Sequence, residues 1–416
     1  MRAQPAVAVL LVASTFAATA QTSNVKPPQA QAWIDVATYS GMGMPGMGAA
    51  GGNPLGALGG LFGGGAGAAK NSFGQTQTGA AGRWVDVTLM TRANPSLAEA
   101  QQAVPAGFLS PALKLQSPKE VRTPAPRDDD DKVVEQDYER PKGKLLLYWG
   151  CGATVRPGQP KVLDMATASA TDMAKFFVSR RATQRGAHSA VGRPVWPSPA
   201  DERMVPDNAS LVGEHQFSGS GVPEGFRFQI QAAQDLMPAL QMQQVDQGGA
   251  TDLTWAALPT ARAYFIAGMG AAKQDEMVIW TSSEVPEAGF GLIDYQTNAA
   301  VDRWLKEKVL LAPATTHCAV PKGVFPGQGG MLRAIAYGNE LNLAHPPRPA
   351  DPKAVWEPVW AAKLRVKSVA TVMLGMPQMG QMPPAGTEPA PKPQPEEKKE
   401  DKMPKPLDLL KGILGR

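Results

Sequence analysis

The chain has 416 residues, 43% of them hydrophobic, which is enough for two or three domains with buried cores. Its 41 basic and 37 acidic residues leave a formal net charge of +4 and form no basic stripe, which argues against a nucleic-acid partner. The 43 glycines and 39 prolines favour strands and loops over long helices.

Residues 1–20 have the pattern of a cleavable signal peptide. Arg2 supplies the positive start, residues 6–16 form a short apolar run, and small residues lead up to Ala20. The alternative, a membrane anchor, needs about 20 apolar residues, and this run is shorter. The pattern predicts cleavage after Ala20 and export, to a bacterial periplasm.

A mainly β N-terminal domain is predicted over residues 30–240. Its first elements are two similar β-prone segments, 33–38 (WIDVAT) and 84–89 (WVDVTL), which are candidates to pair in one sheet. The stretch between them, 41–82, is dominated by Gly, Ala and Met. It lacks the bulky side chains that would offset the entropy of ordering it, so a flexible loop is expected.

The middle of this domain is predicted to mix one helix, a connector and several strands. Ser96 and Glu99 match a capping box, which predicts a short helix toward Val104. Residues 110–142 are rich in Pro and charge and are expected to be a connector. Its Asp128–Asp131 run lacks the alternating ligands of a calcium loop, so a solvated acidic loop is expected.

A second β-sandwich-like domain is predicted over residues 245–375. Three β-runs recur from Thr251 at roughly ten-residue spacing, as in an antiparallel sandwich. One inserted helix, 299–311, is expected from its apolar face and the stop at Pro313. The fold class expected for the whole chain is therefore mainly β, with two β-sandwich-like (immunoglobulin- or fibronectin III-like) domains.

The C-terminal region is predicted to be a tethered peptide. Residues 376–405 are Pro-rich and then mixed in charge, which predicts a disordered linker. Residues 406–416 are expected to form a short amphipathic helix that docks on an envelope protein or a membrane surface. Folding back onto its own domain is the alternative. The apolar face proposed for docking comprises Leu407, Leu410, Ile413 and Leu414.

Two stretches resemble known proteins. Leu253-x-Trp255 followed by Ala261-x-x-Tyr264-x-Ile266 resembles strands of fibronectin type III and immunoglobulin-like domains, a resemblance that covers residues 251–283. It implies that the Trp and Tyr pack between two sheets, although the helix at 299–311 departs from the pattern. The segments YWGCG and VRPGQP, within residues 148–160, resemble uncharacterised secreted proteins of Gram-negative bacteria. That resemblance implies the compartment and no activity.

Few residues suggest catalysis. The two cysteines, Cys151 and Cys318, are candidates for a disulfide in an oxidising compartment, or are two unpaired core thiols. A nucleophilic Cys with a distant His is a third reading. The histidines lack zinc-ligand spacing and no hydrolase motif is complete. They are His188, His215, His317 and His345.

Methionine suggests a metal. A C-terminal repeat places Met at every third residue, and thioether sulfur suits Cu(I). The repeat comprises Met373, Met376, Met379 and Met382. The function favoured by the sequence is a non-catalytic periplasmic binding or envelope-structural protein without a cofactor. The alternatives are a Met-rich Cu(I)-binding protein and an unrecognised hydrolase.

Overall fold

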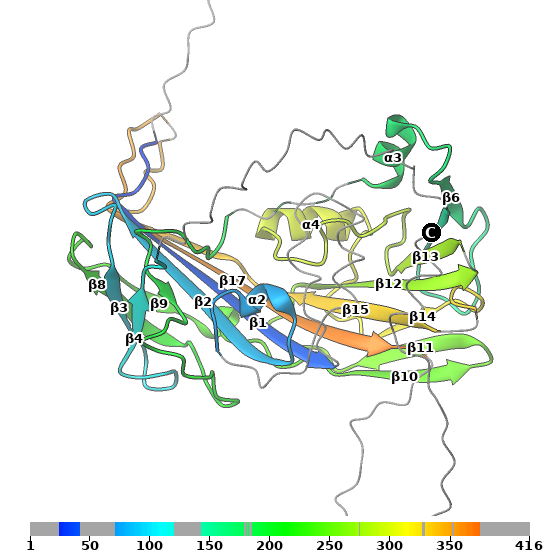
Figure 1. Cartoon of the computed structure of the whole chain (residues 1–416), viewed down its shortest axis with the longest axis horizontal. Coiled ribbons are helices and arrows are strands. Elements are labelled where there is room, and N and C mark those ends of the chain that lie inside the picture. The colour runs from blue at the N-terminus through cyan, green and yellow to red at the C-terminus, as the bar shows by residue number, and fades with distance from the viewer. Residues whose placement is uncertain are drawn as a thin grey trace, which may run out of the picture. The chain divides into compact units, whose positions relative to one another are not determined.

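The computed structural model describes residues 25–41, 71–119 and 143–374, except 179, 181, 183, 184, 274, 327, 328 and 352 (Figure 1). The predicted signal peptide, most of the predicted Gly/Met-rich loop, the C-terminal linker and the C-terminal helix lie outside these residues. By its contacts the chain divides after Gly375, and the described residues all belong to the first unit.

The described residues are mainly β, as predicted, and form two sheets. The strands of the large sheet are β1 (Ala30–Gly41), β2 (Gly82–Thr91), β3 (Glu99–Ala103), β4 (Ala112–Gln116), β5 (Lys144–Trp149), β6 (Lys161–Asp164), β7 (Val195–Trp196), β8 (Gly213–Gly219), β9 (Arg227–Ile230), β12 (Ala263–Lys273), β13 (Glu276–Thr281), β15 (Gly330–Tyr337), β16 (Leu341–His345) and β17 (Trp360–Met373). The small sheet contains β10 (Met242–Gln247), β11 (Ala250–Trp255) and β14 (His317–Val320). The helices are α2 (Gln75–Thr78), α3 (Ala170–Phe176), α4 (Asn298–Lys306) and the 3₁₀ turn η1 (Ala232–Gln234).

The large sheet is mixed. Its order is β6-β5-β13-β12-β15-β17-β1-β2-β7-β4-β3-β8-β9, with β16 pairing beside β17. Most neighbours are antiparallel, but β1 runs parallel to β17 and β5 runs parallel to β13. The sheet curls: Phe226, the residue before β9, stacks on Trp360 of β17 with ring centroids 4.9 Å apart, although several strands separate β9 from β17 in the sheet order.

The two similar segments do pair with each other. β1 and β2 are antiparallel, with Asp35 opposite Asp86 and Ala37 opposite Trp84. β1 also pairs along its whole length with β17, from Ala30 opposite Trp360 onward. Strands from both sides of the boundary predicted between 240 and 245 therefore belong to one sheet rather than to two separate sandwiches.

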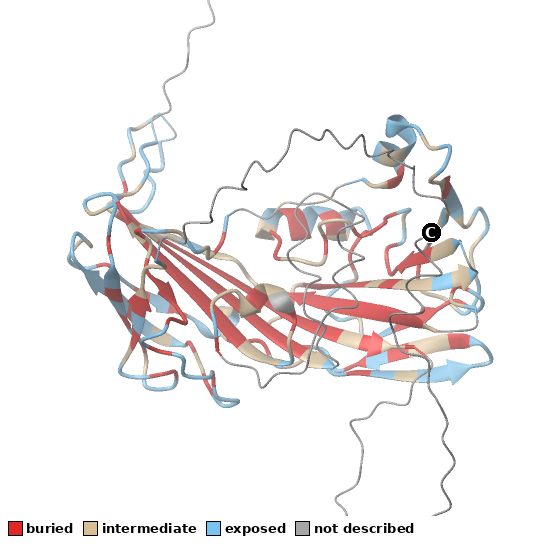
Figure 2. Cartoon of the chain, viewed as in Figure 1, coloured by how far each residue is buried: buried red, intermediate tan, exposed pale blue. Residues whose placement is uncertain are grey.

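Both faces of the central strands are covered, and Figure 2 shows them buried along most of their length. Because side chains alternate across a strand, Ile34 and Val36 of β1 point to one face, where residues of the small sheet such as Leu253 share their hydrophobic cluster. Ala37 and Tyr39 belong to the opposite face, in the cluster that contains Trp304 of α4. The sheet is thus the middle layer of the structure.

The prediction of a helix after Ser96 is wrong. Residues 99–103 form β3, whose side chains alternate between exposed and buried and which pairs with β4 and β8. A strand with partners on both edges satisfies all its backbone groups, which outweighs the local capping signal.

Two predicted irregular segments also contain ordered elements. Residues 71–82 of the predicted loop include α2. The predicted connector 110–142 includes β4, whose Leu113 and Leu115 are buried in the main core. Residues 42–70 and 120–142 lie outside the described part of the chain.

The inserted helix is confirmed, with shorter bounds. α4 ends at Lys306 rather than near 311, and Thr297 caps it by accepting a hydrogen bond from the Ala300 amide. Within residues 251–283, where the sequence resembles fibronectin type III strands, Trp255 and Tyr264 are in contact, with ring centroids 5.5 Å apart. They come from different sheets, β11 in the small one and β12 in the large one.

Candidate functional site

A disulfide joins the two sheets. Cys151, just after β5, bonds to Cys318 of β14 across a sequence separation of 167 residues. The neighbouring backbone supports this crossing, since the Gly152 amide donates to the Ala319 carbonyl at 3.0 Å. Of the readings left open by the sequence, the paired one is therefore observed, and neither sulfur is a free nucleophile.

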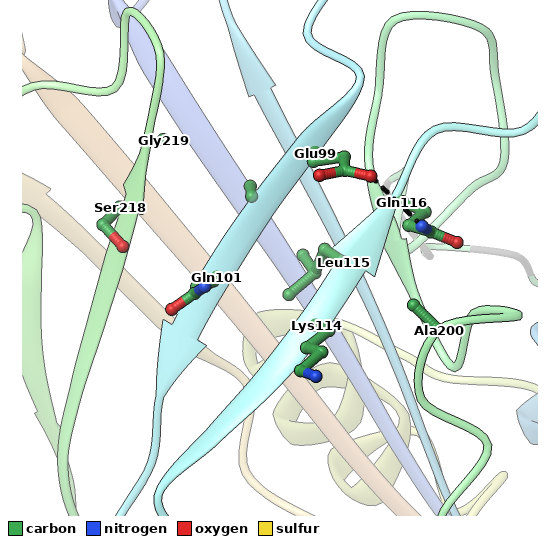
Figure 3. A pocket seen from close by; sticks show the side chains of 9 residues that line it. Glu99, Gln101, Lys114, Leu115, Gln116, Ala200, Ser218 and Gly219 are labelled. Carbon is green, nitrogen blue, oxygen red and sulfur yellow. Dashed lines mark hydrogen bonds between the residues drawn. The ribbon is translucent and has the colours of Figure 1, made fainter.

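An open depression of about 500 Å³ lies on the outward face of the curled end of the large sheet (Figure 3). Its floor is formed by β3 and β4, with β8 on one side and the loop at Ala200 on the other. The lining residues are Glu99, Ala100, Gln101, Lys114, Leu115, Gln116, Ala200, Ser218 and Gly219.

The floor of the depression is held in place from below. Ala100 and Leu115 are directly opposite each other in the β3–β4 pair, and both are buried in the main core. β3 also pairs with β8, so that Gln101 lies opposite Ser218. Since the strands are fixed by ladders on both sides, the outward side chains start from a preformed backbone surface.

The depression offers a mixed set of polar groups. Figure 3 shows the carboxylate of Glu99 accepting a hydrogen bond from the Gln116 amide, at 3.2 Å. The Lys114 ammonium, the Gln101 amide and the Ser218 hydroxyl project from neighbouring positions. Cation, anion, amide and hydroxyl together suit a hydrophilic ligand that carries hydroxyl, amide or carboxylate groups.

Sequence reasoning missed this depression. None of its lining residues was predicted as a site, because β3 was predicted as a helix and β4 as a connector. The alternating pattern of residues 112–116 (ALKLQ) was the available signal. It is short and adjoins prolines, so it did not stand out.

A second polar feature is buried beneath α4 and its neighbouring loops. The Asp35 carboxylate on β1 accepts Nε and Nη2 of Arg365 on β17 at 2.7 and 2.5 Å, and both side chains are buried. The Ala187 amide donates to the same carboxylate at 3.0 Å. Gly186 passes so close that a β-carbon there would lie 1.7 Å from Nη2 of Arg365. This residue must therefore be glycine for the ion pair to form.

Further charges lie along the same face of β17. Nζ of Lys367 lies 3.3 Å from Oδ1 of Asp294 and 4.1 Å from the ring centroid of Tyr295. Arg365 lies on the same ring at 4.3 Å. Burial raises the pKa of Asp294, but the charges of Lys367 and Arg365 outweigh it and hold that pKa below its usual range. Asp35, Arg333 and Tyr39 lie on the same face. We call the following seven residues the buried charge cluster: Asp35, Tyr39, Asp294, Tyr295, Arg333, Arg365 and Lys367.

Asp86 is the carboxyl group directly opposite Asp35. It accepts hydrogen bonds from the Gly74 amide at 2.9 Å and from the amide and hydroxyl of Thr76. Burial raises its pKa to about 7, with a smaller contribution from the charge of Asp35. No cation is paired with Asp86 within the described residues, so its role here is to hold the turn that contains α2.

The histidines lie apart, each with its own partners. His215 is fully buried, stacks on Phe228 and is hydrogen-bonded to the Gln102 side chain at 2.9 Å. Burial lowers its pKa, which keeps the ring neutral. His317 is exposed beside Asp252 at 3.4 Å.

The other two histidines contact tryptophans. His188 packs edge-on against Trp33, and His345 stacks on Trp360. Across the described residues the structure brings no histidine together with a serine or cysteine nucleophile in the depression. The hydrolase prediction gains no supporting arrangement there.

One of the four predicted copper ligands, Met373, lies within the described residues. It ends β17, directly opposite Met331 of β15, and Met331 is in turn opposite Met269 of β12. Residues directly opposite each other in antiparallel strands share one face of the sheet. The structure therefore places three thioether residues in one row, two of which the sequence analysis did not single out.

The remaining predicted site residues lie outside the described part of the chain. These are Met376, Met379, Met382, Leu407, Leu410, Ile413 and Leu414. Within the described residues, no helix has the length and apolar character needed to cross a bilayer. In that same part, His, Cys, Asp and Glu form no group of three suited to a metal ion.

We compared the chain with protein-family models, with curated proteins and with solved structures, and none of them matches it.

Proposed function

We propose that this chain is an exported, disulfide-stabilised binding protein of the bacterial cell envelope that acts without catalysis. Its ligand is a hydrophilic envelope polymer held in the depression on β3, β4 and β8. The observation that carries this proposal is the depression itself, with outward polar side chains on a floor fixed by strand pairing. The disulfide supports the extracytoplasmic part, because such bonds persist in oxidising compartments.

Peptidoglycan is the polymer whose chemistry fits these groups best. Its glycan carries hydroxyl and amide groups, which pair with the amide of Gln101 and the hydroxyl of Ser218. Its peptides carry carboxylates, which pair with the ammonium of Lys114. The periplasmic location, which the signal pattern predicts, supplies the polymer.

The test is co-sedimentation of the purified mature chain with isolated peptidoglycan sacculi. We expect the double variant Gln101→Ala/Lys114→Ala to remain in the supernatant under conditions in which the wild type pellets. The matched control is Arg227→Ala/Gln229→Ala, which removes two exposed side chains of β9 outside the depression. Equal pelleting of both double variants and the wild type, or no pelleting of the wild type, would contradict the proposal.

The second candidate function, binding of Cu(I), is favoured by the methionine row Met269–Met331–Met373. Adjacent strands lie about 4.8 Å apart, so flexible thioether side chains of three neighbouring strands can converge on one ion. Met331 is buried, whereas Met269 and Met373 are partly exposed, so the row runs from the interior toward solvent. Soft sulfur ligands select Cu(I).

Competition with a chromophoric Cu(I) chelator measures this activity. We expect Met331→Leu to lower the Cu(I) affinity at least tenfold, and Met165→Leu, a partly buried methionine in a different cluster, to leave it unchanged. A triple Leu variant at 376, 379 and 382 separates the row from the C-terminal repeat. If the chelator removes all copper from the wild type at equal concentration, Cu(I) binding is refuted.

Two finer expectations remain proposals. Docking of the C-terminal helix on an envelope protein or membrane surface rests on its predicted apolar face. A fibronectin type III-like arrangement over residues 251–283 is supported by the contact between Trp255 and Tyr264 across two sheets. Deleting 406–416 and measuring fractionation with membranes tests the first of these.

A further inference from the structure

Arg333 on β15 is a buried cation with unpaired N–H donors. The residue is only 5% exposed, and its Nε and Nη2 atoms are buried with no hydrogen-bond partner. Its guanidinium carbon lies 5.8 Å from the ring centroid of Tyr39, which gives the charge an aromatic neighbour but no acceptor for these two N–H groups. A buried N–H without a partner destabilises a fold, and a buried charge does so more strongly.

Two other arginines bind a carboxylate through the Nε/Nη2 edge of the guanidinium group. Arg365 donates through Nε and Nη2 to the two oxygens of Asp35. Arg203 donates through the same two atoms to the two oxygens of Asp201, at 2.7 and 2.6 Å. This edge of the planar guanidinium matches the spacing of a carboxylate. Arg333 presents the identical edge, and no carboxylate of the described residues occupies it.

The neighbouring charges are already paired with each other. In the buried charge cluster, Asp35 is paired with Arg365 and Asp294 with Lys367. Arg333 therefore leaves the cluster with one positive charge in excess. The hydroxyl of Tyr295, in the same cluster, is a second buried group without a hydrogen-bond partner. Both groups can donate a hydrogen bond, and the charge of Arg333 favours an acceptor that carries negative charge.

We propose that the Nε/Nη2 edge of Arg333 binds the carboxylate group of a small ligand bidentately, at the end of the buried charge cluster. This site is separate from the depression on β3 and β4, so its failure would leave the proposed envelope function untouched.

Burial around Arg333 indicates where such a ligand enters. Arg333 is opposite Ala267 of β12 and Thr371 of β17, and Thr371 is opposite Gly41 of β1. Ala267 and Thr371 are half-buried and Gly41 is exposed, whereas the row at Phe265 and Val369 is fully buried. Arg333 therefore lies at the margin of the fully buried region of this face, and the ligand is expected to enter from the side of Gly41 and Thr371.

The test uses acetate as the probe and the full mature chain as the protein. At constant ionic strength, set with sodium chloride, we expect acetate to raise the melting temperature of the wild type. Arg333→Lys keeps the charge but loses the planar fork, and we expect its acetate affinity to fall at least tenfold by calorimetry. Arg333→Met removes both and is expected to show no acetate response.

Two controls make the outcome decisive. Arg303→Met removes an exposed arginine of α4 and should leave the acetate response unchanged. The ¹⁵Nε–¹H resonance of Arg333 should shift on addition of acetate in the wild type, which reports the contact directly and needs no variant. An absent shift together with equal melting in acetate and chloride would overturn the proposal, as would an acetate response that survives in Arg333→Met.

Discussion

Removing the carboxylate of Asp35 should be among the most damaging single changes to this protein. Asp35 is 1% exposed, and its two oxygens accept Nε and Nη2 of Arg365 as well as the Ala187 amide. In Asp35→Ala the guanidinium of Arg365 stays buried and loses both hydrogen bonds to Asp35, and the Ala187 amide loses its acceptor. The methyl group of alanine cannot accept these hydrogen bonds or balance the charge of Arg365.

The expected loss of unfolding free energy is about 3–5 kcal/mol, the usual cost of breaking a buried ion pair by removing one partner. Arg365→Met should cost a similar amount, since it leaves Asp35 as the unpaired buried charge. The double variant should cost about 1–3 kcal/mol less than the two single costs added together, because neither charge is then left alone.

Equilibrium unfolding in urea, followed by circular dichroism at pH 7, measures these values. The exposed pair Lys26–Glu357, with side chains 63% and 55% exposed, supplies the control. Lys26→Met should cost less than about 1 kcal/mol. If Asp35→Ala also costs less than about 1 kcal/mol, or if the single costs of Asp35→Ala and Arg365→Met are additive, the buried pair does not stabilise the sheet as argued.

Three further predictions concern other parts of the molecule. Cys151→Ser/Cys318→Ser opens a loop closed across 167 residues and should lower the unfolding free energy by about 5 kcal/mol in the chain-entropy model; unchanged urea midpoints would contradict this. Asp86 keeps its proton up to pH about 7 when folded but releases it near pH 4 when unfolded, so its contribution to stability should fall by about 3 kcal/mol as pH rises from 4 to 7. Asp86→Asn should flatten that slope, and an unaltered slope would refute the assignment. Trp304→Ala empties a site that is 1% exposed and should cost about 3–5 kcal/mol, measured by the same unfolding assay.

Local sequence patterns predicted the regular elements where burial is periodic. The paired segments at 33–38 and 84–89, and the helix capped at Thr297, follow from alternation and from an apolar helical face. The pattern failed at residues 96–104, where pairing with β4 and β8 outweighed a capping box. Strand order is set by contacts far apart in sequence, so the parallel pairing of β1 with β17 is not readable from either strand.

The candidate sites depended on the same long-range information. The depression exists only because β3, β4 and β8 are neighbours, and its side chains are ordinary surface residues in the sequence. Met269 and Met331 become partners of Met373 only through register. The pairing of Cys151 with Cys318 was one of the readings the sequence allowed, and geometry was needed to select it.

Hydrogen–deuterium exchange with and without soluble peptidoglycan fragments tests the central claim, that the curled end of the sheet binds an envelope polymer. The account predicts slower exchange confined to β3, β4 and β8, which form the depression. Slower exchange at other strands only, or identical exchange throughout at saturating fragment concentration, would contradict it.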